Sequence, residues 1–225
     1  MDSTPNFESG PQAPRSTPRE HPLRTFFRAA TSWAVARHRG RHEPAIEDHI
    51  SDGILSEFIH IDRIHSIRDE EGEPVSDMSG MAQESLQTSA ARSGIERDLE
   101  VHQHVGDYAL YMAGIFPEYL EREAASNPTP LLACIGSAVV SMREPVDYYI
   151  VEGRSAYSHV SRLYRSLDST RSGVFHRLSN RFEEYLEEGR RRAFELGNRG
   201  PIRFAADGQL AKEILDAYWR TGFYV

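Results

Sequence analysis

The sequence has almost no cysteine and almost no lysine. Among its 225 residues, Cys134 is the only cysteine and Lys212 is the only lysine. A single thiol excludes an internal disulfide, and it also excludes a zinc site built on paired cysteines. Lys212 is therefore the one residue available for lysine-based covalent chemistry. We interpret the preference for arginine as a coding bias.

Common catalytic and cofactor motifs are also missing. The chain contains no glycine-rich phosphate-binding loop, no His-Glu-x-x-His metal motif and no Gly-x-Ser-x-Gly nucleophile elbow. We therefore expect no cofactor, and the sequence leaves open whether the protein is an enzyme. The net charge of −8 argues against a general nucleic-acid binder, because such affinity comes from basic charge.

The sequence lacks long hydrophobic runs and a secretory signal. Its most apolar stretch, Leu131–Met142, is too short to cross a bilayer, and we expect it to form a buried helix. Residues 1–20 are rich in Pro, Ser and Gly and hold almost no large apolar side chain. This composition predicts a disordered N-terminal tail. A cytoplasmic location with no transmembrane segment is the expectation.

The rest of the chain has the periodicity of amphipathic helices. Apolar residues recur at three- and four-residue spacing, whereas alternating strand patterns and fixed repeats are missing. We predict an all-α fold, with one helical bundle domain over residues 21–225. The predicted helices are His21–Arg41, Pro44–Ile67, Val75–Ala91, Ile95–Phe116, Tyr119–Ala125, Leu131–Met142, Val146–Leu167, Gly173–Leu196 and Asp207–Trp219.

Two of these helices have faces of particular interest. The helix His21–Arg41 carries arginines opposite its apolar face, which fits a core helix with a solvated face. Docking on an acidic membrane surface or on a partner is the less favoured alternative. In Val146–Leu167, the small residues Gly153 and Ala156 would permit a close helix crossing.

A polar line runs along the helix Ile95–Phe116. Glu100, His104, Asp107 and Tyr111 are spaced so that they share one face, although the second half of this helix is otherwise apolar. A buried carboxylate must be paired, hydrogen-bonded or protonated. Asp107 is therefore the residue of this line that most needs an explanation.

Two interpretations of this line stay open. In the functional one, Asp107 contacts His104 across one turn and orients its ring as part of a general base. Tyr111 and Tyr157 would complete this catalytic or ligand-sensing site. In the structural one, Asp107 pairs with an arginine of a neighbouring helix, and His104 caps that pair.

A metal site is a further hypothesis. Glu57 and His60 have the Glu-x-x-His spacing of di-iron carboxylate bundles, and His102 or His104 could add a ligand. No second copy of the motif exists in the helical core, and the helical wheel turns His60 away from the inner stripe of Ile50, Ile54, Phe58, Ile61 and His65. We therefore assign no metal site and keep Glu57 and His60 as the weaker alternative.

Two sequence motifs resemble those of an uncharacterised bacterial all-helical protein family. The first reads His104-Val105-Gly106-Asp107-Tyr108-Ala109-Leu110, followed by Gly114-Ile115-Phe116-Pro117-Glu118. The second is Tyr148-Tyr149 followed by Gly153-Arg154-Ser155-Ala156-Tyr157. The segment 55–68 is also similar, and the likeness covers roughly residues 23–194. It implies a helical fold and the importance of these positions, and it brings no activity.

These observations favour a non-catalytic binding or interaction domain. Its partner is unknown, and a protein partner, a small apolar ligand or a second copy of the chain would all fit. An enzyme or ligand sensor built on His104 and Asp107 is the first alternative, and a metal-binding bundle is the second.

Overall fold

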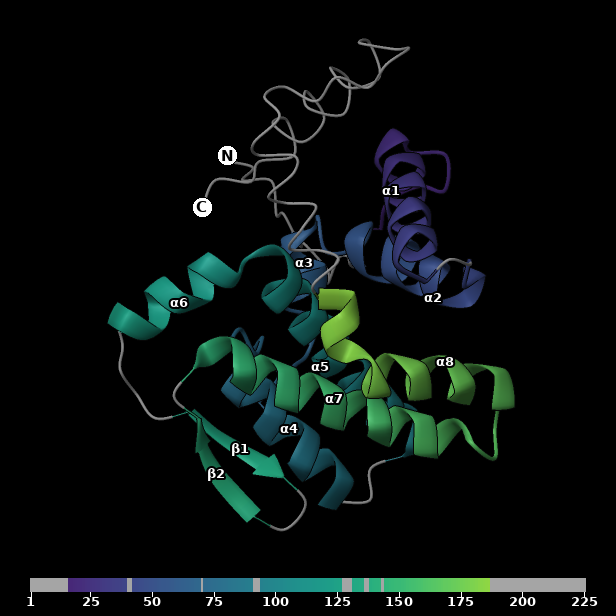
Figure 1. Cartoon of the computed structure of the whole chain (residues 1–225). Helices are drawn as coiled ribbons and strands as arrows, with labels where there is room; N and C mark the ends of the chain where they lie inside the picture. Colours follow the sequence, from purple (N-terminus) through teal and green to yellow (C-terminus); the bar gives the residue numbers. More distant parts are fainter. Residues whose placement is uncertain are drawn as a thin grey trace, which may run out of the picture.

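A computed structural model describes most of the chain as one helical domain (Figure 1). The described residues are 16–39, 42–69, 71–90, 94–126, 131–135, 138–142 and 144–186. Within them the fold is all-α apart from one two-stranded hairpin. The predicted fold class is therefore confirmed, with one local exception.

The described residues form α-helices, one π-helix and one two-stranded hairpin. They are α1 (Pro22–Arg39), α2 (Pro44–Asp48), η1 (His49–Leu55), α3 (Ile61–Ile64), α4 (Met78–Ala90), α5 (Ile95–Ile115), α6 (Pro117–Ser126), β1 (Leu131–Ile135), β2 (Ala138–Met142), α7 (Pro145–Tyr164) and α8 (Ser169–Asn180).

Helix α5 is the centre of the domain. It contacts α4, α6, α7 and η1, and α7 contacts α8 on its other side (Figure 1). The second half of α5 is buried nearly all round, as the sequence predicts. Among the described residues, twenty-seven buried side chains form one hydrophobic core to which α5 contributes along its length.

Small residues allow α5 and α7 to approach closely. A Cβ atom added to Gly106 of α5 would lie 2.5 Å from the Tyr157 ring of α7. One added to Gly153 of α7 would lie 2.7 Å from the Cβ of Ala109 and 2.5 Å from the Phe182 ring. The prediction that Gly153 permits a close crossing is therefore confirmed.

The predicted helix Pro44–Ile67 is wrong as one continuous element. After α2 the chain widens into the π-helix η1, where the Ser56 N–H donates to the Ser51 carbonyl at 3.0 Å. The backbone at His60 is then extended before α3 begins. A π-helical turn changes the angular position of every later residue. The stripe consequently fails at Ile61, which is 66% exposed.

The predicted helix Leu131–Met142 is also wrong. These residues form the antiparallel strands β1 and β2, with Ile135 opposite Ala138. Gly136 and Ser137 separate two apolar runs, and a two-residue Gly-Ser link is a hairpin signal. Val139 and Val140 add β-branched side chains that suit a strand. The hairpin contacts α7 (Figure 1).

The predicted disordered tail and the last predicted helix fall largely outside the described residues. Residues 1–15 and the whole of Asp207–Trp219 lie there. Thr17 is described and buried, and its hydroxyl donates to the Ser56 carbonyl. Among residues 16–20, Thr17 is buried and the other four are exposed.

The arginines of α1 are partly used in packing. Arg24 forms an ion pair with Glu57 at 2.7 Å, and Arg28 pairs with Asp52 of η1. Leu23 and Val35 of the same helix are buried. These contacts favour the interpretation of α1 as a core helix.

None of the described helices has the combination of length and hydropathy that crossing a membrane requires.

The close crossing predicts opposite effects for two Gly→Ala substitutions. Gly153→Ala should lower the free energy of unfolding, because overpacking costs about 1–3 kcal/mol and the gain in helix propensity is at most about 1 kcal/mol. Gly173→Ala in α8 should raise it by about 0.8–1.0 kcal/mol, since the nearest atom is an Arg177 nitrogen 3.8 Å away. Urea unfolding measures both. Stabilisation by Gly153→Ala would show that the crossing is loose.

Candidate functional site

The structure does not unite the predicted polar line of α5 in one site. Glu100 is exposed and pairs with Arg97 at 3.2 Å on the same helix. Tyr111 is buried, and its hydroxyl donates to the Phe58 carbonyl at 3.4 Å. His104 and Asp107 are both buried, but each bonds to different partners. The four residues therefore point into different surroundings.

His104 is a hydrogen-bonded core histidine. Its Nε2 lies 2.9 Å from the Ile64 carbonyl, and its Nδ1 lies 3.3 Å from the Ser66 hydroxyl. This geometry fits a neutral ring that donates from Nε2 and accepts at Nδ1. Burial lowers the pKa of His104, and the charge of Asp107 only partly opposes that effect. No hydrogen bond joins His104 to Asp107, so the predicted general-base pair is not formed.

Asp107 instead joins three elements. Its Oδ1 atom accepts from His49 Nε2 of η1 at 2.8 Å and from the Tyr157 hydroxyl of α7 at 2.7 Å. Burial raises the pKa of Tyr157 well above its usual value, and the neighbouring Asp107 charge adds to this effect. The phenol therefore stays protonated and remains a donor.

The structural interpretation of Asp107, as one half of an ion pair with an arginine, is also wrong. Asp107 was expected to pair with an arginine, and its partners are a histidine and a tyrosine. Tyr157 was among the predicted site residues, whereas His49 was not. His49 is the first residue of η1 and lies beside Ile50 of the predicted inner stripe, so the sequence pattern did not single it out. Its ring also packs edge-on against Phe175.

Glu57 and His60 do not converge on a metal site. Glu57 pairs with Arg24 and with Arg63, and the Nε2 atom of His60 lies 3.2 Å from the Thr17 hydroxyl. In the part of the chain that the structure describes, one compact group of metal-capable side chains exists, and it contains neither residue. That group is Asp98, His102 and His159.

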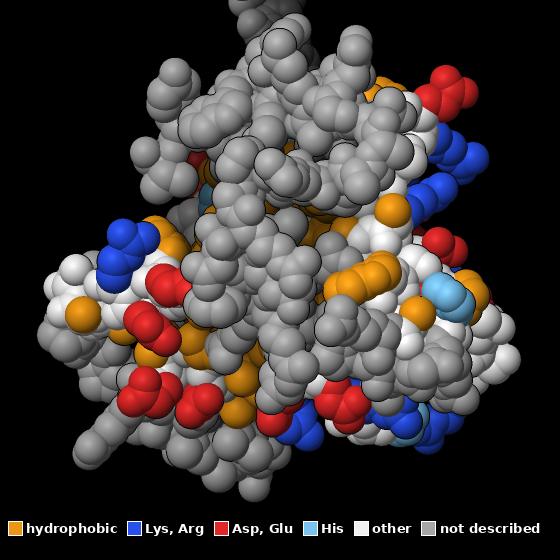
Figure 2. Space-filling view, turned by 45° about the horizontal axis from the view of Figure 1, so that its top comes forward, with side chains coloured by type: hydrophobic (Ala, Val, Ile, Leu, Met, Phe, Trp, Pro, Cys, Tyr) orange, Lys and Arg blue, Asp and Glu red, His pale blue; other side chains and the backbone are white. Residues whose placement is uncertain are grey.

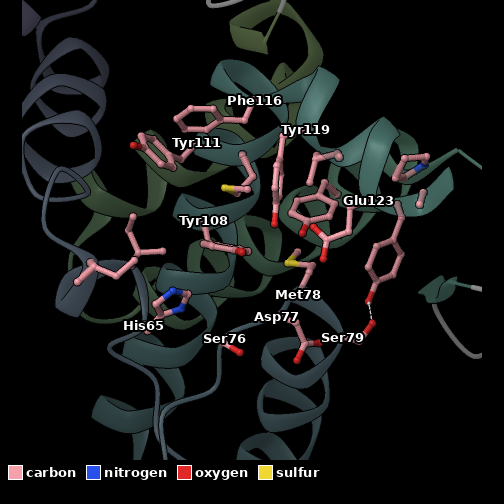
Figure 3. A pocket seen from close by; sticks show the side chains of 18 residues that line it. His65, Ser76, Asp77, Met78, Ser79, Tyr108, Tyr111, Phe116, Tyr119 and Glu123 are labelled. Carbon is pink, nitrogen blue, oxygen red and sulfur yellow. Dashed lines mark hydrogen bonds between the residues drawn. The ribbon is translucent and has the colours of Figure 1, made fainter. Parts of the chain in front are cut away.

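A pocket opens on the other side of α5, among α4, α6 and α7. Its volume is about 630 Å³. Figure 3 shows the rings of Tyr108 and Tyr119 and the carboxyl group of Glu123 directed into the same space. The pocket is lined by Ile61, Ile64, His65, Ser76, Asp77, Met78, Ser79, Tyr108, Tyr111, Met112, Phe116, Tyr119, Leu120, Glu123, Ala124, Pro145, Tyr148 and Tyr149.

Among the predicted site residues, Tyr111 lines this pocket, and Glu100, His104, Asp107 and Tyr157 do not. The tyrosine spacing on α7 is visible in the sequence, but it does not show that α4, α5 and α6 add their own aromatic and methionine side chains. The pocket was missed for that reason.

The pocket carries negative charge and protonated phenols. Its lining includes Asp77 and Glu123 but no lysine or arginine. Burial raises the pKa of Tyr108 to about 12, and burial also raises the pKa of Tyr149. A hydrogen bond to Glu123 raises the pKa of Tyr119. On the face drawn in Figure 2, acidic side chains gather at the left, where α6 lies.

We compared the chain with known protein families, curated proteins and solved structures, and none of the three comparisons gives a significant match.

The Asp107 network predicts a specific order of stabilities. Tyr157→Phe should lower the free energy of unfolding by about 1.5–3 kcal/mol, because the buried carboxylate loses a donor. Asp107→Asn should also be destabilising, since the charge that both donors face is removed. Tyr111→Phe is the matched control: its hydroxyl makes a long bond to an uncharged carbonyl, so the loss should be about 1 kcal/mol or less. Chemical unfolding measures all three.

Full stability of the Asp107→Asn variant would contradict the network, and so would an equal loss for Tyr157→Phe and Tyr111→Phe.

Proposed function

We propose that this domain is a non-catalytic binding domain whose ligand is a small organic molecule held in the tyrosine-lined pocket. The observation that carries the proposal is the pocket itself, which is about 630 Å³ in volume and is lined mainly by aromatic and aliphatic side chains. Small-molecule sites typically have this size and are mostly apolar with a few polar groups. The polar groups here include His65, Asp77 and Glu123.

The charge of the lining favours a ligand with a positive group. Five tyrosines line the pocket, and a cation placed over the face of such a ring is attracted by its quadrupole. The carboxyl groups of Asp77 and Glu123 add attraction of the same sign, and the lining contains no lysine or arginine to oppose it. A small aromatic or aliphatic ammonium compound combines the two features.

The alternative of an enzyme or sensor using His104 and Asp107 receives less support. Both ring nitrogens of His104 are bonded within the protein, and Asp107 accepts from His49 and Tyr157. Neither residue lines the pocket. General-base catalysis requires the base to reach a substrate proton directly or through one water.

Family membership, a cytoplasmic location and a protein partner or homo-oligomer are further parts of the proposal. The likeness to the bacterial helical family gains support from where its motif residues lie, because Gly106, Asp107, Gly153 and Tyr157 all meet at the α5–α7 crossing. We also propose that the protein is cytoplasmic and that it binds a protein partner or a second copy of itself. The ligand-binding experiment does not depend on any of these three properties.

The test compares a cation with its uncharged isostere. Benzyltrimethylammonium and neopentylbenzene have nearly the same shape, and tyrosine fluorescence follows their binding to the full chain. We expect the cation to bind about two- to fivefold more tightly, which corresponds to one exposed cation–π contact of about 0.5–1 kcal/mol. Glu123→Gln should weaken the cation alone, whereas Tyr119→Ala should weaken both compounds.

Leu86→Ala is the matched control, because Leu86 is exposed on α4 and does not line the pocket. Equal affinity for the two compounds would refute the charge preference. No binding of either compound, or equal binding to the wild type and the Tyr119→Ala variant, would refute the pocket as the site.

A further inference from the structure

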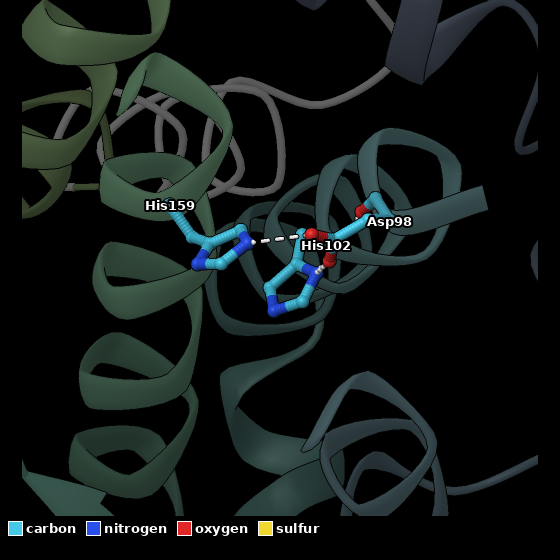
Figure 4. Close-up of side chains that lie close together, drawn as sticks. All are labelled: Asp98, His102 and His159. Atoms are coloured by element: carbon cyan, nitrogen blue, oxygen red, sulfur yellow. Dashed lines mark hydrogen bonds and ion pairs between the residues drawn. The ribbon is translucent and has the colours of Figure 1, made fainter. Parts of the chain in front are cut away.

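A second cluster of chemically capable side chains lies away from the pocket, where α5 crosses α7. Asp98 and His102 are one turn apart on α5, and His159 faces them from α7 (Figure 4). One potential ligand atom from each residue lies within 4.8 Å of the other two. Two histidines and one carboxylate are the donor set that binds non-haem iron or catalytic zinc in proteins.

The carboxylate of Asp98 already bridges the two imidazoles. His102 Nδ1 lies 2.9 Å from Oδ1, and His159 Nε2 lies 3.1 Å from Oδ2. The two rings are stacked with their centroids 4.0 Å apart. Donors on one tetrahedral ion, at bond lengths of about 2.0–2.2 Å, are separated by roughly 3.3 Å. The three ligand atoms lie within 4.8 Å of one another. An ion that replaces the bridging protons therefore requires the two stacked rings to turn until both nitrogens point at it.

The packing of α5 against α7 holds the three side chains together, and the cluster is partly open to solvent. The crossing that places Tyr157 over Gly106 also brings His159 to His102, so packing of the two helices fixes the spacing. The His102 side chain is 9% exposed and that of His159 is 25% exposed. Solvent can therefore reach the ion from the α7 side and complete its coordination shell.

We propose that Asp98, His102 and His159 bind a divalent first-row transition-metal ion, with zinc as the ion to test first. The site uses three protein ligands and leaves at least one position for water. It shares no residue with the tyrosine pocket. It also differs from the metal hypothesis based on Glu57 and His60.

Arg162 lies beside His159 and opposes metal binding at this site. Its Nη2 atom lies 3.2 Å from His159 Nδ1, so the guanidinium donates to that nitrogen. A ring that binds a metal through Nε2 carries its proton on Nδ1, which competes with this donation. The positive charge of Arg162 also repels a dication. Removing this guanidinium should therefore strengthen metal binding.

The experiment titrates the untagged 225-residue chain with Zn²⁺ by calorimetry and with Co²⁺ by visible absorption. We expect one equivalent to bind and Zn²⁺ to raise the Tm of the wild type. His159→Ala should weaken binding by more than about tenfold, since losing even a second-shell partner typically costs 10–100-fold. Arg162→Gln should tighten it. His176→Ala is the matched control, because His176 is an exposed histidine on α8 that bonds to Asn180.

His159 is partly exposed, so its variant tests the site without removing the more buried His102. No binding of either ion by the wild type would overturn the proposal, and so would unchanged affinity in the His159→Ala variant. Weaker binding by Arg162→Gln would overturn the assigned geometry, because that variant removes a competitor and not a ligand.

Discussion

The hydrogen bonds to the buried carboxylate of Asp107 hold the centre of this domain together. His49 from η1 and Tyr157 from α7 both donate to its Oδ1 atom, so one side chain joins three elements. A buried charge without donors is strongly destabilising. His49 is the first residue of the π-helix η1, and its ring reaches the Asp107 carboxylate of α5. Gly106 adds the space that the Tyr157 ring occupies.

This arrangement divides the functions of α5 between its faces. On the face toward α7 and η1, polar and small residues build a closed junction. On the face toward α4 and α6, Tyr108 and Tyr111 line the tyrosine pocket. The motif around Asp107 thus belongs to the scaffold, and the binding function that we propose lies beside it. At the Asp98 end of the same helix, the α5–α7 crossing assembles the proposed metal site.

Helices with a long and regular apolar periodicity could be predicted from the sequence, whereas the π-helix and the hairpin could not. The helices α5 and α7 bury most of their apolar stripes, because burial of one face dominates their free energy. On α1, by contrast, Trp33 of the apolar stripe is 43% exposed. The π-helix has no comparable sequence signal, so the break after Asp48 and the exposure of Ile61 were missed. In the hairpin, length and hydropathy suggested a helix, although Gly136-Ser137 and the β-branched residues indicated strands.

For the sites, the sequence identified the importance of Asp107 but not its partners. The i, i+3 spacing of His104 and Asp107 allows a contact, yet Ile64 and Ser66 hold the His104 ring elsewhere. His49 and His159 come from segments 58 and 61 residues away from the carboxylates that they contact. Such pairs depend on how helices cross, which a single sequence does not reveal.

We infer that Asp107 and Tyr157 belong to the scaffold and propose that the tyrosine pocket is the binding site. NMR spectra of the protein with ring-labelled tyrosines, recorded with and without benzyltrimethylammonium, test it most directly. We expect the resonances of Tyr108, Tyr119 and Tyr149 to shift while that of Tyr157 stays in place. A shift confined to Tyr157 would contradict the account, because it would place the ligand at the Asp107 junction.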